Sequence, residues 1–172
     1  MLFYMGPKRG PILSWNASYK LSWSDFKAKP NNRVSAAALT ASGITFGFSI
    51  QQTDDKRVIS FQTEVNAQFY PEKSWFKTEL ADNHVLGHEQ LHFDITELHT
   101  RKFRQQISKL KISQSIKNEL HGLHKSINKD LETMQNTYDT ETNYSRNVET
   151  QAKWQLFITQ ELQKLSEYKT VD

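Results

Sequence analysis

The sequence predicts an α+β domain in which a small, mostly antiparallel sheet packs against one long helix and two further long helices complete the body. All four prolines lie within the first 71 residues, where apolar and polar residues alternate as in half-buried strands. The rest of the chain has no proline and repeats its apolar residues at intervals of three and four, as amphipathic helices do. The length of 172 residues suits one domain (1–172), with an N-terminal extension (1–20), a strand-rich part (21–71) and a helical part (72–172).

Two segments of the N-terminal half are predicted as strands with one face on a core. The first alternates four apolar residues with small or polar ones (Ile44, Phe46, Phe48 and Ile50). The second alternates over residues 59–69 (Ile59, Phe61, Thr63, Val65, Ala67 and Phe69), and the polar stretch QTDDKR between the two suits a hairpin turn. Residues 34–41 form a weaker third strand. Residues 21–30 predict a strand end followed by one helical turn capped by Ser24 or Asp25.

Three helices are predicted in the C-terminal part. The first begins near Asp82 or Asn83, both good N-caps, and continues to about Leu110. The second carries a continuous apolar seam (Ile112, Ile116, Leu120, Leu123, Ile127, Leu131, Met134 and Tyr138). The third starts after Ser145 and is expected to turn five residues inward (Val148, Ala152, Phe157, Leu162 and Leu165).

The stretch GHEQLHFDITELHTRKF in the first predicted helix holds His88, Glu89 and His92 in the order H-E-x-x-H. Residues four apart share one face of a helix, so the two imidazoles can point at one metal ion. Glu89 lies about 100° around the helix from His88, close enough to act on a water at that ion. Zinc lowers the pKa of a bound water to about 7, and a glutamate can take its proton during attack on a carbonyl. The pattern therefore predicts His88 and His92 as zinc ligands and Glu89 as general base.

The alternative interpretation is a pair of structural histidines in a buried stripe. A lone histidine in such a stripe would favour the structural interpretation, whereas two histidines with Glu89 between them favour a metal site. A catalytic zinc needs a third protein ligand, and the third histidine of the longer motif is replaced here by Leu98. His99 lies roughly 10 Å along the helix axis beyond His92, too far for the same ion. The third ligand must come from another part of the chain, and His121 with His124 is expected at a solvated helix edge.

Four stretches resemble one bacterial family in kind and order. The most specific is HEQLHFDI (88–95); the others are LSWSDFKAKP (21–30) with a Trp-x-Asp-Phe element, KSWF (73–76) with a Ser-Trp element, and YDTETNYSRNVETQAKW (138–154). They are similar to the predicted secreted zinc-dependent proteases catalogued as domain of unknown function 922. The resemblance covers residues 21 to 154. It implies a single zincin-like metallopeptidase domain that is secreted or periplasmic, although the N-terminus shows no clear signal-peptide pattern.

The resemblance also implies the roles of the site residues. His88 and His92 correspond to the zinc ligands and Glu89 to the catalytic base. Where the family has His-Gly, this chain has Tyr144 and Ser145, so either Tyr144 or Asp139 is expected to complete the metal sphere, with Glu141 a weaker candidate. The loop 138–146 would bring this ligand across the first helix. Tyr144 could instead donate a hydrogen bond to the oxyanion of the reaction intermediate.

These patterns favour zinc-dependent hydrolysis of peptide bonds in a peptide or protein substrate, which an edge strand such as 57–69 could align by strand addition. The alternative is a non-catalytic binding or scaffold domain with a structural or lost metal site.

The composition limits the other partners of the protein. Its net charge is only +3, and the basic run over residues 101–129 suits a solvated helix face, so we do not expect it to bind nucleic acid. No apolar run is long enough to span a membrane. The chain has no cysteine, which excludes disulfides and thiolate ligands.

Three further expectations concern single residues. Glu97 and Arg101, four apart, should pair on the helix surface. Asp94 either orients a ligand histidine or a neighbouring loop, or lies on the helix surface without a role at the site. The side chains of three tryptophans are expected to anchor the core rather than contact substrate (Trp23, Trp75 and Trp154).

Overall fold

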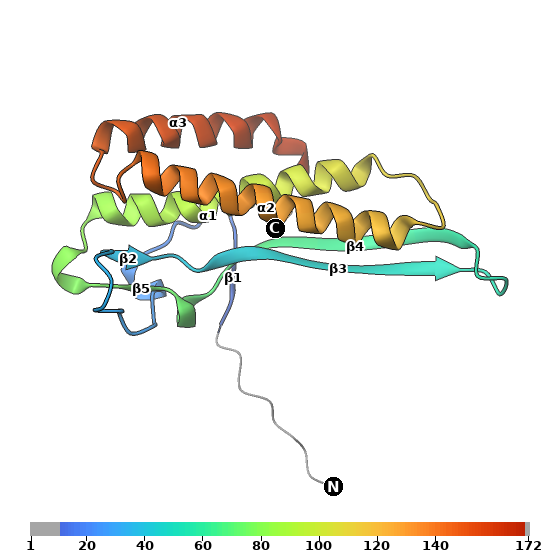
Figure 1. The fold of residues 1–172 in the computed structure, drawn as a ribbon, viewed down its shortest axis with the longest axis horizontal. Coiled ribbons are helices and arrows are strands. Elements are labelled where there is room, and N and C mark those ends of the chain that lie inside the picture. The colour runs from blue at the N-terminus through green and yellow to red at the C-terminus, as the bar shows by residue number, and fades with distance from the viewer. Residues whose placement is uncertain (1–10, 171–172) are drawn as a thin grey trace, which may run out of the picture.

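The computed structural model describes residues 11–170 and has the predicted α+β architecture, with three long helices gathered on one side of a long hairpin (Figure 1). The strands are β1 (Leu13–Ser14), β2 (Ala38–Leu39), β3 (Ser42–Gln52), β4 (Val58–Phe69) and β5 (Trp75–Phe76). The helices are α1 (Asn83–Ser108), α2 (Ile116–Glu141) and α3 (Val148–Lys164). Residues 1–10 of the expected N-terminal extension lie outside the described residues, while Leu13–Ser14 form β1.

The β3–β4 hairpin confirms the two predicted strands and corrects one detail. Phe46 pairs with Val65 and Phe48 with Thr63, so the predicted apolar face turns towards the helices as one surface. Near the turn the register shifts at Gln51/Gln52, and this irregularity places Val58 in the core and leaves Ile59 exposed. The prediction that Ile59 faces inward was therefore wrong, because a bulge changes which face successive residues occupy.

The sheet order revises the expected edge strand. β4 lies between β1 and β3 in an antiparallel three-stranded sheet, so β3 forms one edge. β1 pairs only with Gln68 and Phe69, so the rest of β4 has no strand partner among the described residues on that side. The weak strand expected at 34–41 is reduced to β2, which pairs with β5 in a separate antiparallel pair. The helical turn expected within 21–30 is a single 3-10 turn, Trp23–Asp25, and its N-cap is Ser22 rather than Ser24 or Asp25.

The first two helices match their predicted periodicity. Asp82 is the N-cap of α1 and accepts a hydrogen bond from the Val85 backbone at 2.7 Å. α2 begins at Ile116, four residues later than the seam suggested, and Ile112 is exposed. The seam itself is confirmed over five buried positions (Ile116, Leu120, Ile127, Leu131 and Tyr138).

The buried face of α3 matches the prediction in part, since Leu162 and Leu165 pack against the core. Val148, Ala152 and Phe157 are exposed, while Gln151 and Ile158 are buried. The side-chain amide of the buried Gln151 donates to the His84 carbonyl at 3.0 Å, which satisfies that donor inside the fold, while its Oε1 atom has no hydrogen-bond partner in the described structure. A polar residue thus occupies a position that hydrophobicity alone assigns to the surface.

α1 is the central element of the fold. It packs against β3 and β4 on one side and against α2 and α3 on the other, and it contributes to all three apolar clusters of the core. Its pair Glu97 and Arg101, expected on the surface, is buried with exposed fractions of 0% and 4%. Arg101 binds Glu97 at 2.7 Å and the Leu162 carbonyl at 2.7 Å, so the pair joins α1 to α3.

The tryptophans pack against apolar side chains, as expected. Trp75 is buried, Trp23 stacks on Phe76, and the half-buried Trp154 contacts Tyr138. Within the described residues, no helix combines the length and the apolar character that crossing a membrane requires.

Candidate metal centre

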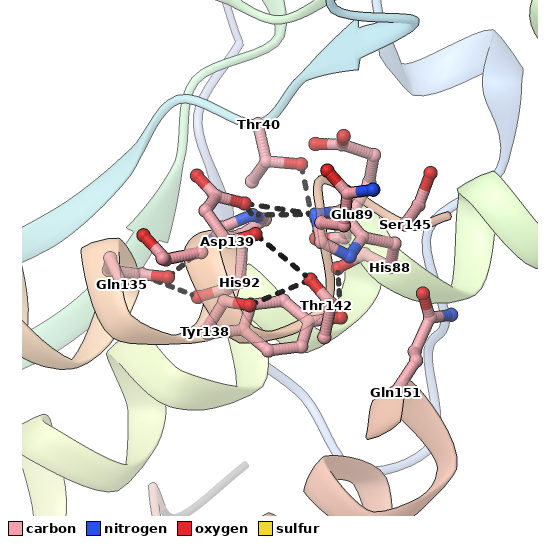
Figure 2. Close-up of polar contacts among 12 residues, drawn as sticks. Thr40, His88, Glu89, His92, Gln135, Tyr138, Asp139, Thr142, Ser145 and Gln151 are labelled. Atoms are coloured by element: carbon pink, nitrogen blue, oxygen red, sulfur yellow. Dashed lines mark hydrogen bonds and ion pairs between the residues drawn. The ribbon is translucent and has the colours of Figure 1, made fainter. Parts of the chain in front are cut away.

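The candidate centre lies where the N-terminal turns of α1 meet the C-terminal turns of α2 (Figure 2). His88 and His92, one turn apart on α1, direct their Nε2 atoms at Asp139 of α2. The distances from Asp139 Oδ1 are 3.1 Å to His88 and 3.0 Å to His92, and the two Nε2 atoms are 3.2 Å apart. Helical spacing on α1 and antiparallel packing of α2 together form this triangle.

The three atoms could hold a metal ion. They all lie within 4.8 Å of one another, and within residues 11–170 the group has these three members. Neighbouring ligand atoms of a tetrahedral zinc, with bonds of about 2.0–2.1 Å, are about 3.3 Å apart, close to the spacing found here. Two imidazole nitrogens and one carboxylate oxygen are donors that suit zinc.

Gln135 holds His92 in one orientation. The Nδ1 of His92 donates to Gln135 Oε1 at 2.5 Å, and the amide of Gln135 donates to the His92 carbonyl at 2.9 Å. Burial lowers the pKa of His92, but the hydrogen bond to Asp139 and the charges of Glu89 and Asp139 outweigh it, so this pKa is raised above its ordinary value. With Nδ1 fixed as a donor, Nε2 is the atom presented to the cluster.

Tyr138 packs against His88 and hydrogen-bonds to its backbone. Its buried ring stacks on the His88 ring, with centroids 4.5 Å apart and planes at 21°, and its hydroxyl donates to the His88 carbonyl at 3.3 Å. Burial raises the pKa of Tyr138, so the hydroxyl stays protonated and remains a donor. The Nδ1 of His88 is buried and has no hydrogen-bond partner in the described part of the chain.

Asp139 is an ionised carboxylate in this arrangement. Burial alone would raise its pKa, but hydrogen bonds from His88 and His92, together with their charges, hold it well below the usual range. It lies in the last turn of α2, because residues 138–141 are helical, and the expected loop from 138 is wrong in that respect. The third-ligand candidate is thus carried by a rigid element.

A tight turn after α2 fixes Asp139 relative to Tyr144. The Tyr144 N–H donates to the Asp139 carbonyl at 2.8 Å and the Asn143 N–H to the Thr140 carbonyl at 3.2 Å, the two bonds of a Schellman motif. Asn143, Tyr144 and Ser145 all have positive φ, of 49°, 52° and 71°. Each such residue costs about 1–3 kcal/mol, so the surrounding contacts must hold the turn in place.

Glu89 lies beside the cluster without a partner. The residue is only 4% exposed and lines the same cleft as both histidines, and its buried Oε2 atom has no hydrogen-bond partner within the described residues. Its backbone is held, since Thr40 Oγ1 donates to the Glu89 carbonyl at 3.1 Å (Figure 2). A buried carboxylate oxygen without a donor is costly, and this one belongs to a residue that lines the cleft beside the two histidines.

Tyr144 lies on the wall of this cleft rather than in the triangle. Its side chain is 56% exposed and makes no hydrogen bond to either histidine in the described structure. Of the two candidates for a third metal ligand, Asp139 therefore lies beside the two histidines and Tyr144 does not. Glu141 points elsewhere and accepts a hydrogen bond from Trp154 at 2.8 Å.

The cleft itself has a volume of about 440 Å³. One wall comes from the helices that carry the triangle and Glu89, and the other from the extended segment 34–42 that includes β2. Tyr144 and Ser145 also line it. The cluster is therefore open towards a space large enough for part of a substrate.

Other polar residues of the sequence analysis have structural roles. Asp94 accepts hydrogen bonds from the Trp15 indole at 2.7 Å and from Gln90 at 2.9 Å, so it holds the N-terminal segment and not a ligand histidine. His121 is exposed and His124 half-buried on α2, as expected of a helix edge, and both rings contact phenylalanine rings. Gln135 was missed by sequence reasoning, although its spacing of four from Asp139 places both residues on one face of α2.

Comparison with known proteins gives one match. Residues 15–147 match the family described as "Bacterial protein of unknown function (DUF922)". No curated protein and no solved structure is significantly similar to the chain. The matched range contains the H-E-x-x-H residues, Asp139 and Tyr144. The chain therefore belongs to this bacterial family of unknown function, DUF922.

Proposed function

We propose that this protein is a zinc-dependent metallopeptidase in which His88, His92 and Asp139 hold the metal and Glu89 is the general base. The observation that carries the proposal is the buried, unpartnered carboxylate of Glu89 beside a group of three potential ligands. A structural histidine pair would not need this carboxylate. A hydrolytic site needs one, because attacking water must lose a proton.

The donor set supports zinc but is shared with other metals. Two histidines and one carboxylate bind catalytic zinc and also non-haem iron. Glu89 favours hydrolysis, since oxygen chemistry at iron requires no neighbouring general base of this kind. When bound, zinc supplies Lewis-acid activation of water and of the scissile carbonyl.

The residues of the chain have distinct roles in the proposed reaction. Glu89 accepts a proton from the attacking water and returns it to the leaving amine. Tyr144, on the wall of the cleft, donates a hydrogen bond to the oxyanion that develops on the carbonyl oxygen. Its position on the lining of the cleft, on a backbone turn held by hydrogen bonds, supports this role.

The segment 34–42 supports an extended peptide substrate. β2 pairs only with β5 among the described strands, so its other edge has no strand partner, and residues on both sides of β2 line the cleft. A substrate can therefore add to this edge by backbone hydrogen bonds. We place the substrate on β2 and not on residues 57–69, which the sequence suggested, because β2 lines the cleft and β4 does not.

The test combines metal content with cleavage. The purified protein is analysed for zinc and iron, and wild type and Glu89→Gln are compared on a peptide library. We expect about one zinc per chain in both proteins, cleavage by wild type, and cleavage at least about a hundredfold slower in the variant. Protein that contains no zinc and takes up none on titration would overturn the proposal.

The rival is a non-catalytic domain with a structural metal. A structural zinc site is closed by four protein ligands, whereas the group described here has three and opens on the cleft. Stoichiometric zinc in a wild-type protein that cleaves no peptide would favour the rival.

A further inference from the structure

A second pocket lies beside the metal cleft. Its volume is about 420 Å³, and it is lined by eight residues (Val34, Ser35, Ala36, Ala37, Leu80, Tyr144, Ser145 and Arg146). Five of these also line the metal cleft (Val34, Ala36, Ala37, Tyr144 and Ser145), so the two hollows adjoin along a shared wall. A peptide at the cluster would place a neighbouring group in this second hollow, which we call the Arg146 pocket.

The chemistry of the Arg146 pocket differs from that of the metal cleft. Its walls are small or apolar, and Arg146 is the one charged residue in the lining, whereas the metal cleft carries Glu89 and Asp139. Within residues 11–170, Arg146 forms no ion pair with any carboxylate. Its guanidinium makes a long hydrogen bond of 3.4 Å to the Asn143 carbonyl. A guanidinium in such a setting is available to a carboxylate, which it binds by charge-assisted hydrogen bonds.

Both walls of the Arg146 pocket are fixed by hydrogen bonds. On one side, the His84 ring donates to the Ser145 carbonyl at 2.6 Å and the Arg146 N–H donates to the Asn143 carbonyl at 3.2 Å. On the other, buried Lys77 donates from Nζ to the Val34 carbonyl at 2.5 Å and from its backbone to Ala37 at 2.8 Å. The pocket is therefore formed before substrate arrives, which favours selective binding.

We propose that the Arg146 pocket binds a carboxylate of the peptide substrate close to the scissile bond, and so determines specificity. The inference rests on the proposed peptidase function and names its substrate class. The carboxylate has two sources, an Asp or Glu side chain within the peptide or the free C-terminus of the peptide. Both present the same anion to Arg146, and they are separated by experiment.

The activity test uses a cleaved peptide in matched forms. Residues on either side of the cleavage site are replaced by Glu, Gln or Lys in turn, and the C-terminus is made as free acid or amide. We expect kcat/KM to be about tenfold or more higher when the carboxylate is in the favoured position. In Arg146→Gln this ratio should fall to about one, and Arg146→Glu should shift the preference towards Lys. Arg57→Gln, in the distant hairpin turn, is the matched control.

A binding test does not depend on turnover. The same peptides are titrated into zinc-loaded Glu89→Gln protein and into the double variant with Arg146→Gln, with fluorescence anisotropy as the readout. A carboxylate preference confined to the protein with Arg146 supports the inference, and the Glu and C-terminal series show which source is used. Equal affinities for charged and neutral peptides overturn it. Peptide binding without any cleavage by wild type instead overturns the proposed function.

Discussion

Gln135 on α2 binds His92 on α1 at two points, accepting from the ring Nδ1 and donating to the backbone carbonyl. One amide therefore fixes both the position of the helix turn and the orientation of the imidazole. Because Nδ1 is committed to Gln135, Nε2 is left to face Asp139. This contact ties the geometry of the cluster to the packing of the two helices.

Replacing Gln135 by Leu should weaken zinc binding by about 10–100-fold, because the imidazole loses the acceptor that orients it. The measurement is competition with a chromogenic zinc chelator. Asn136→Ala, at an exposed position one residue further along α2, is the control and should bind zinc like wild type. Unchanged zinc affinity in Gln135→Leu would show that His92 does not need this partner.

Variants of Asp139 and Tyr144 should show that Asp139 is a zinc ligand and that Tyr144 acts in catalysis. Asp139→Asn keeps the shape but removes the charge, and we expect its zinc affinity to fall by at least about a hundredfold. Tyr144→Phe should keep zinc affinity close to that of wild type and lower kcat/KM by about a hundredfold, the usual loss for one oxyanion donor. Zinc loss in Tyr144→Phe with retention in Asp139→Asn would reverse the two assignments.

The sequence correctly predicted the helices and strands that are determined by residues close together in the chain. α1 follows from its cap at Asp82 and its apolar period, and the β3–β4 hairpin follows from strict alternation around a polar turn. The positions of His88, Glu89 and His92 on one helix need only the spacing within a single element. All of these depend on neighbours within a few residues, where helix and strand periods are reliable.

The remaining features depend on contacts between distant segments. The amide of the buried Gln151 meets the carbonyl of His84, and no property of α3 itself indicates this contact. Whether Asp139 or Tyr144 lies beside the two histidines depends on where α2 ends against α1. Ile59 turns outward because of a register shift that the polar turn does not reveal. In each case the arrangement depends on contacts between distant segments, which the local pattern does not contain.

Glu97 and Arg101 should contribute strongly to stability because the pair is buried. Removing one partner leaves an uncompensated charge, so Glu97→Ala should lower the free energy of unfolding by about 3–5 kcal/mol. The double replacement Glu97→Leu with Arg101→Met should recover much of this loss. Urea unfolding followed by circular dichroism measures both. The exposed pair Glu149 and Lys153 is the control, and Glu149→Ala should cause no measurable change.

The stability of the protein should fall in mild acid partly because of His99. Burial lowers the pKa of His99 below its ordinary value, and the charge of Lys102 acts in the same direction. Below about pH 6.5 the unfolded chain therefore takes up a proton that the folded protein does not, which favours unfolding. The contribution is absent above that pH and grows as pH falls towards the pKa of the folded state.

The check is a comparison of unfolding free energies from pH 7 to pH 5 in wild type and His99→Gln. We expect the slope against pH to be shallower in the variant by up to about 1.4 kcal/mol per pH unit, the value for one proton. Taking the difference between the two proteins cancels the titration of all other groups. His121→Gln, which removes an exposed histidine from α2, controls for the loss of any histidine. Identical slopes in wild type and His99→Gln would mean that His99 accepts a proton in the folded protein as readily as in the unfolded chain.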